Sequence, residues 1–201
     1  ITAESYVNIR LTGHTQLVGG LQFLDQNTDQ SYLSLSDFGP FSSKLGGDSA
    51  HVQQYSAYAS YLITDLSGFN FEAGLRANHH SLYGNNYTYT INPSFNTGDH
   101  SKIFINISSA YKIPSLYQLY TPIYGNTGLK PETGLNLEAG AEAYLAGKRL
   151  TLSLTGFARD QKHVIAFQMD PATYAYRYVN YNHQRLYGGE FEGDFRIPDR
   201  L

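Results

Sequence analysis

Histidine offers this chain its widest range of possible chemistry, because it acts as acid, base or metal ligand near neutral pH. The seven histidines are His14, His51, His79, His80, His100, His163 and His183. None lies beside a nucleophile motif, and none has the spacing of paired metal ligands. The adjacent pair His79–His80 could bind a metal at a strand end, but two exposed histidines without a metal are the favoured interpretation. We therefore expect no enzyme, no metal site and no cofactor.

A calcium loop is the second chemistry to weigh. The segment 25–29 (DQNTD) alternates oxygen-bearing side chains as the start of an EF-hand does. An EF-hand also needs glycine at its sixth position and glutamate at its twelfth, where this chain has Gln30 and Ser36. A solvated polar loop is the favoured interpretation, and calcium in the loops stays a weaker alternative.

Tyrosine is the most distinctive side chain, with 18 copies in 201 residues. Several copies fall in segments that break the strand pattern: Tyr83, Tyr117, Tyr120 and Tyr124, with Tyr32 and Tyr174 as weaker candidates. Their rings offer flat, amphipathic surface at low entropic cost, which suits a large polycyclic ligand. The alternative is that they pack within their own loops. We predict that Tyr83, Tyr117, Tyr120 and Tyr124 contact a ligand.

The segment 110–142 holds most of these tyrosines. Its prolines Pro114, Pro122 and Pro131 forbid one continuous helix or strand, so the sequence predicts a folded loop between two strands. Loops of this length usually carry function. Ser115 can cap a short helical turn that places Leu116, Leu119 and Tyr120 on one face.

Alternation of apolar and polar residues runs through the rest of the chain and predicts about nine strands. They cover residues 5–11, 14–23, 52–63, 68–79, 86–96, 101–111, 133–145, 149–165 and 184–197, with an extended piece at 174–180. Short, turn-rich connections alternate with long ones at 24–51, 112–132 and 166–183, and the link at 81–85 is intermediate. Short turns at one end and long loops at the other are typical of bacterial outer-membrane barrels.

Taking one parity on each predicted strand gives a run of residues without charge. These uncharged runs contain many alanines and glycines. Their larger residues include Val7, Ile9, Leu17, Leu21, Tyr55, Tyr61, Phe71, Leu75, Tyr87, Ile91, Ile103, Ile105, Leu135, Leu137, Leu150, Leu154, Phe191 and Phe195. The opposite face carries Arg10, Glu72, Arg76, Lys102, Glu138, Glu142, Arg159, Glu190, Glu192, Asp194 and Arg196. So much alanine and glycine suits contact with lipid better than a packed core, so we expect the apolar face outside and the polar face inside.

Aromatic residues on the apolar face sort into two bands. Phe23, Tyr55, Tyr87, Tyr89, Tyr111 and Tyr187 fall near the long loops, and Tyr61, Phe69, Phe71, Phe95 and Phe195 near the short turns. Two such girdles mark the two membrane interfaces. A soluble β-sandwich that folds without detergent is the alternative.

Composition limits the remaining choices. The chain has 41% hydrophobic residues, no cysteine and a formal charge of -3, which argues against disorder, disulfide frameworks and nucleic-acid binding. No apolar run exceeds four residues, so no transmembrane helix is expected.

The segment from Tyr111 onward resembles the C-terminal barrel signature of TonB-dependent outer-membrane receptors. The matching motifs are YKIPSLYQLY (111–120), Gly125-Asn126, LKPE (129–132), Glu138-Ala139-Gly140, Tyr178-Val179-Asn180 and GGEFE (188–192). Within that family the stretch looks most like the cobalamin transporters, with siderophore receptors close behind. The resemblance implies an all-β fold: an antiparallel, up-and-down transmembrane barrel segment with long extracellular loops.

The resemblance also implies partners and a function. It implies a bacterial outer-membrane receptor that takes up a scarce nutrient complex, first cobalamin and second a ferric siderophore. Its partners would be outer-membrane lipid, a small-molecule ligand, an N-terminal plug domain and, through that plug, the energy-coupling protein TonB. Plug contact is the expected role of Glu72, Arg76, Glu138 and Glu142. The alternative function is a structural or adhesive outer-membrane protein that binds a protein or glycan and transports nothing.

The family barrel of about 22 strands needs more than twice this chain. We therefore expect residues 1–201 to be one partial barrel domain, with the plug and the other strands elsewhere. The last residues, Pro198 to Leu201, are expected to form the next short turn.

Overall fold

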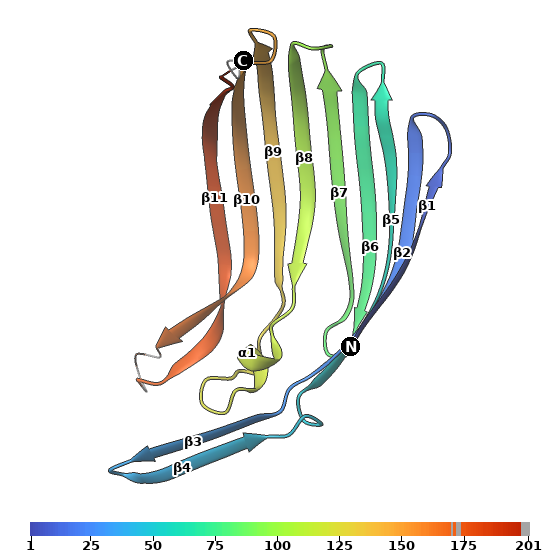
Figure 1. Ribbon diagram of the computed structural model, residues 1–201. Helices are drawn as coiled ribbons and strands as arrows, with labels where there is room; N and C mark the ends of the chain where they lie inside the picture. The colour runs from blue at the N-terminus through green and yellow to red at the C-terminus, as the bar shows by residue number, and fades with distance from the viewer. Residues whose placement is uncertain (170, 172–173, 198–201) are drawn as a thin grey trace.

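The chain forms one curved antiparallel sheet of nine strands and a separate two-stranded hairpin (Figure 1). A computed structural model describes residues 1–169, 171 and 174–197. The sheet strands are β1 (Thr2–Arg10), β2 (Thr15–Asn27), β5 (His51–Leu66), β6 (Phe69–His80), β7 (Gly84–Asn96), β8 (Ser101–Lys112), β9 (Glu132–Leu145), β10 (Leu150–Met169) and β11 (Tyr176–Phe195). Neighbours in the sheet are neighbours in the sequence, apart from the hairpin inserted between β2 and β5. This up-and-down order confirms the expected all-β architecture.

The register keeps the charge-free residues together on one face of the sheet. Leu17 lies opposite Tyr61, Phe95 opposite Ile103, and Leu154 opposite Phe191. The pairings between sheet strands preserve this parity, apart from a register shift between Ile63 and Leu66 at the end of β5. Many of these side chains are exposed, including Leu75, Ile105 and Phe191. Side chains of a strand alternate between its two faces, so a register that pairs apolar positions with apolar positions is sufficient to produce this face.

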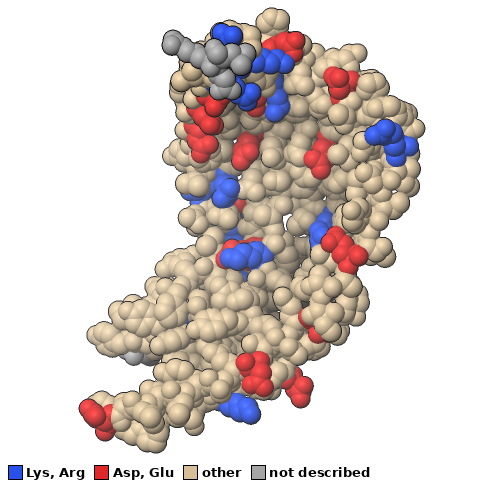
Figure 2. Space-filling model, in the orientation of Figure 1, with Lys and Arg blue, Asp and Glu red and all other residues tan. Residues whose placement is uncertain are grey.

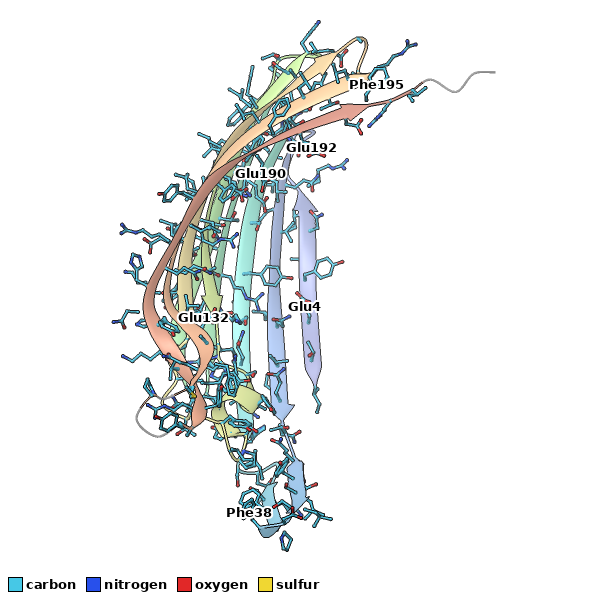
Figure 3. All side chains as sticks on the ribbon, turned by 90° about the vertical axis from the view of Figure 1, so that its left-hand side faces the viewer. Glu4, Phe38, Glu132, Glu190, Glu192 and Phe195 are labelled. Atoms are coloured by element: carbon cyan, nitrogen blue, oxygen red, sulfur yellow. The ribbon has the colours of Figure 1, made fainter. Side chains whose placement is uncertain are left out.

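The polar residues lie on the concave face of the sheet. Figure 2 shows acidic and basic side chains spread over this face, and Figure 3 shows Glu190 and Glu192 on the same side of β11. Large inward rings lie over glycines of the neighbouring strand. A Cβ on Gly140 would come within 2.6 Å of the Phe104 ring, and a Cβ on Gly188 within 2.7 Å of the Phe157 ring. These glycines let inward aromatic rings lie flat against the wall.

Connections differ in length between the two ends of the sheet, as predicted. At one end the links are short, such as residues 67–68 between β5 and β6, where Ser67 and Gly68 both have positive φ. At the other end lies the segment between β8 and β9, which holds the helix α1 (Leu116–Tyr120). The link between β6 and β7 is an exception: it lies at this second end but is short, at residues 81–83, where the sequence predicts an intermediate length.

Two of the expected long loops contain more strand than predicted. The segment 24–51 contains the hairpin β3 (Gln30–Ser36) and β4 (Gly39–Leu45), which projects from the loop end of the sheet with Phe38 at its tip (Figures 1 and 3). β10 and β11 extend into the expected loop 166–183, so only residues 170–175 connect them, and the extended piece at 174–180 joins β11. The turn expected at 198–201 lies outside the described residues.

The core is small and lies at the loop end rather than along the sheet. Among the described residues, the buried hydrophobic side chains are Ala50, Val52, Leu119 and Leu129. A sandwich would bury one face of its sheet, so this distribution argues against the soluble alternative. In the described part of the chain, no helix has the length and apolar character needed to cross a membrane.

Candidate ligand-binding loops and inner face

The segment 113–131 is a folded loop that begins with a capped helix. The Ser115 hydroxyl accepts a hydrogen bond from the Gln118 backbone N–H at 3.1 Å, and the Gln118 side chain accepts one from the Ser115 N–H at 2.9 Å. This capping box starts α1 where the sequence predicts it. The helix buries Leu119, which is 2% exposed, and leaves Tyr117 half exposed.

Asn180 fixes this loop to the last two strands. Its side-chain oxygen accepts a hydrogen bond from the Lys130 N–H at 2.8 Å. Its side-chain nitrogen donates to the Lys130 carbonyl at 2.9 Å and to the His163 carbonyl at 2.6 Å. The Asn126 side chain donates to the Tyr178 carbonyl at 2.8 Å. The paired motifs 125–132 and 178–180 are therefore the two halves of one hydrogen-bonded junction.

Glu132 supports the same junction from the start of β9. Its carboxylate accepts the Ile165 N–H at 2.8 Å and pairs with the Lys112 ammonium at 3.3 Å. Beyond Lys162, β10 pairs with β11 but not with β9, so this carboxylate takes over an N–H that the sheet leaves free. The LKPE segment (129–132) therefore holds the loop in place through Lys130 and Glu132.

An aromatic cluster forms where the loop contacts β10 and β11. The Phe167 ring lies 5.3 Å from Tyr124, 5.4 Å from Tyr176 and 5.0 Å from Tyr178, and Tyr117 meets Tyr178 at 6.3 Å. Tyr117 and Tyr124 thus lie in one group, as their predicted role requires. Phe167, Tyr176 and Tyr178 were not among the predicted site residues, although the aromatic alternation from Tyr174 to Tyr178 was visible in the sequence.

Tyr83 and Tyr120 lie apart from that cluster, in a second group. The Tyr83 hydroxyl donates to the Leu129 carbonyl at 3.0 Å, and its ring lies 5.3 Å from the ring of His80. Burial and the neighbouring phenols of Tyr120 and Tyr111 raise the pKa of Tyr83 to about 12. Tyr83 therefore helps to hold the loop in place through its hydrogen bond to Leu129. Ligand contact by Tyr83 and Tyr120 stays a prediction.

The raised pKa of Tyr83 predicts a change of stability at high pH. An unfolded tyrosine titrates near pH 10, so the folded state favours the neutral phenol. The stabilisation is complete below about pH 10 and is lost as the pH rises toward 12. Thermal unfolding of the full-length receptor should show a shallower loss over this interval in Tyr83→Phe than in the wild type. The exposed hairpin variant Tyr32→Phe should retain the wild-type slope, and equal slopes for all three proteins would contradict the account.

The four charged residues predicted to contact a plug all lie on the inner face, but in different surroundings. The Arg76 guanidinium donates to Asn78 at 2.8 Å and to Gln22, and its Cζ lies 5.7 Å from the Tyr58 ring centre. Glu72 accepts from Asn92 at 3.2 Å.

Of the other two, Glu142 is paired within the wall, with Lys102 at 3.4 Å and with the Tyr144 hydroxyl. Glu138 lies opposite Asn106 and lines a hollow together with Arg159 and Glu190. The wall thus holds Arg76 and Glu142 in place, and their contact with a plug stays a prediction.

The two sites considered for metals in the sequence are the pair His79–His80 and the segment 25–29. Successive strand residues point to opposite faces, so His79 is exposed while His80 is buried at 3% exposure. The Asp25 carboxylate accepts hydrogen bonds from Gln53 at 2.8 Å and from His51 at 3.1 Å. Among the described residues, no group of three or more histidines and carboxylates could hold a metal ion.

Comparison with known proteins places this architecture in a family. Residues 2–199 match the family model described as TonB dependent receptor-like, beta-barrel. The chain is 30% identical over 202 residues to the ferric enterobactin receptor of Pseudomonas aeruginosa, covering 87% of this chain and 27% of the receptor. It is 27% identical to the vitamin B12 transporter BtuB of Photobacterium profundum, covering 79% of this chain and 24% of the transporter. The chain thus spans about a quarter of the length of these curated relatives.

Solved structures agree with this assignment. A mutant (Q482A) ferric enterobactin receptor from Pseudomonas aeruginosa, in complex with enterobactin, superimposes with a TM-score of 0.75 at 27% identity, covering 94% of this chain and 32% of that chain. The copper transporter OprC, at 14% identity, shares the fold with a TM-score of 0.75, covering 98% of this chain and 35% of its own. The chain belongs to the TonB-dependent receptor family of outer-membrane β-barrels and forms part of the barrel wall.

Proposed function

We propose that this chain is the partial barrel domain of a receptor that imports a ferric siderophore across the outer membrane and performs no catalysis. The observation that carries the proposal is the aromatic cluster of Tyr117, Tyr124, Phe167, Tyr176 and Tyr178, which the loop forms with β10 and β11 at the outer end of the wall. Aromatic rings of a catecholate siderophore would stack on such a surface. Import would use energy that TonB passes to a plug domain of the same protein.

The choice of cargo rests on the relatives. The match to the ferric enterobactin receptor covers 87% of this chain at 30% identity, against 79% at 27% for the vitamin B12 transporter. Taken alone, the motifs of residues 111–192 make cobalamin the first candidate for the cargo. The match to the ferric enterobactin receptor covers more of this chain and favours a ferric siderophore. Cobalamin is the second candidate, because its polycyclic ring would also fit an aromatic surface.

We place the plug against the inner face at the sites with free hydrogen-bonding capacity. Glu138 and its neighbour Glu190 line one hollow with Arg159, and Glu72 has a single amide partner. The carboxylates of Glu138, Glu190 and Glu72 can accept hydrogen bonds from a plug. The side chains of Arg76 and Glu142 already bond to neighbours in the wall, which hold them in position for a plug.

Removal of the Tyr117 ring tests the ligand-binding role of the cluster. We expect Tyr117→Ala in the full-length receptor to bind ferric enterobactin about tenfold more weakly, the range for loss of one aromatic contact. Isothermal titration calorimetry in detergent, with cyanocobalamin as the second ligand, measures this. The control Tyr89→Ala removes a similarly exposed tyrosine from the outer face and should leave the affinity unchanged. Unaltered affinity in Tyr117→Ala would contradict the proposed site.

A further inference from the structure

His80 is a buried histidine at the loop end of β6, in contact with the residues that hold the folded loop 113–131. It is 3% exposed, and the register places Gln54 of β5 and Gly84 of β7 opposite it. Its ring lies 5.3 Å from the ring of Tyr83, whose hydroxyl donates to the Leu129 carbonyl at 3.0 Å. Leu129 belongs to the loop and is 2% exposed. His80, Tyr83 and Leu129 therefore connect the sheet to the loop through buried contacts.

The hydrogen bonding of His80 requires a neutral imidazole. Its Nδ1 accepts a hydrogen bond from the Leu82 backbone N–H at 3.1 Å, so the ring hydrogen is assigned to Nε2. The Nε2 atom is buried and has no hydrogen-bond partner among the described residues. A second proton would bind Nδ1, where it would face the Leu82 N–H and break this hydrogen bond. Burial also disfavours the imidazolium, because its charge would lose contact with water.

The surroundings of His80 do not compensate for such a charge. Among the described residues, the titratable groups around His80 and Tyr83 are one imidazole and two phenols: His79, Tyr111 and Tyr120. Phenols are neutral at pH 7, and His79 would add a like charge. β5 and β7 place uncharged residues opposite His80, and the charged residue of the loop is the exposed Lys130. The site thus favours a neutral His80 from every side that packs on it.

We propose that His80 is a latch that holds the loop on the sheet while its imidazole is neutral, and that protonation of this imidazole releases the loop. Protonation removes the acceptor of the Leu82 N–H, and the link 81–83 then moves to bring the charge to water. The link carries Tyr83, so the hydrogen bond to Leu129 is lost with it. The same loop holds Tyr117 and Tyr124, so weaker cargo binding at acid pH follows, and that consequence alone rests on the proposed function.

Hydrogen exchange of the full-length receptor without ligand tests the latch. In the released state the imidazole should titrate near pH 6.5, as in an unfolded chain, whereas the seated loop keeps it neutral. The opening equilibrium of the loop should therefore rise about tenfold between pH 7.5 and pH 5.5. The protection factors of residues 126–131, corrected for the intrinsic exchange rate at each pH, should fall by the same factor, while those in the middle of β9 stay constant.

Neutral replacements of His80 should abolish this pH dependence. His80→Gln keeps a side-chain acceptor and does not titrate in this range, so its protection factors should be equal at the two pH values. His80→Asn is the second neutral variant, for the case in which glutamine prevents folding. The control His79→Gln removes the exposed neighbouring imidazole and should retain the tenfold change.

Three results would overturn the proposal. They are equal protection of the wild type at the two pH values, a tenfold change that persists in the His80 variants, and loss of the change in His79→Gln. Because the measurement contains no ligand, failure of the latch is distinct from failure of the proposed cargo.

Discussion

Ile105→Arg should destabilise the full-length receptor by about 2 to 4 kcal/mol, the cost of an arginine at the midplane of a barrel's lipid face. Ile105 is 44% exposed on the outer face of β8, directly opposite Ala139 of β9. Its register neighbours on that face, Ala139 and then Gly156, carry no charge, so the guanidinium must remain in hydrocarbon or distort the bilayer. Reversible urea unfolding in lipid vesicles measures the change as a shift of the transition midpoint.

The matched control places the same charge on the other face. Thr155 points inward from β10 and lies opposite Glu190, so Thr155→Arg introduces its guanidinium beside a carboxylate and water. Its free energy of unfolding should change by less than about 0.5 kcal/mol, as for ordinary exposed positions. Equal losses in the two variants would contradict the assignment of the apolar face to lipid.

Asn180→Ala should release the loop from β11 and weaken ligand binding. The substitution removes the partners of the Lys130 N–H, the Lys130 carbonyl and the His163 carbonyl at once. Each unsatisfied group costs about 1 to 3 kcal/mol if it stays buried, so the loop gains more by opening to water. The ferric siderophore affinity should fall at least about tenfold, because binding must then order the loop again.

Hydrogen exchange separates this loop effect from a general loss of folding. The amides of residues 126–131 should lose protection in Asn180→Ala, while those of β5 and β6 keep theirs. Asn182→Ala changes an exposed asparagine two residues along the same strand and should alter neither exchange nor affinity. Retained protection at residues 126–131 in Asn180→Ala would contradict the role given to the junction.

The strands and their faces were predictable because they depend on local periodicity. Once the turns fix the register, a period of two residues decides which side of each strand meets lipid. The hairpin of β3 and β4 was missed although Leu33 and Leu35 alternate with serines. The many polar residues of this segment suggested a loop, and the structure leaves both leucines exposed. Burial, which periodicity predicts, plays little part in that hairpin.

The junction was not predictable from periodicity. Asn180 meets Lys130 across 50 residues of sequence, and nothing near either residue signals the contact. Two of the five residues in the aromatic cluster were predicted, Tyr117 and Tyr124 of the loop. Phe167 could not be placed there without the extension of β10.

The most direct test of the central proposal is uptake of radioactive iron from ferric enterobactin by cells that express the full-length receptor. The parent strain lacks its own catecholate receptors, and a matched strain also lacks TonB. We expect uptake in the first strain, none in the second, and reduced uptake with Tyr117→Ala. Binding to both strains without uptake in either would contradict import and favour an adhesive or structural protein, whereas TonB-dependent uptake of cobalamin instead would retain transport and replace the cargo.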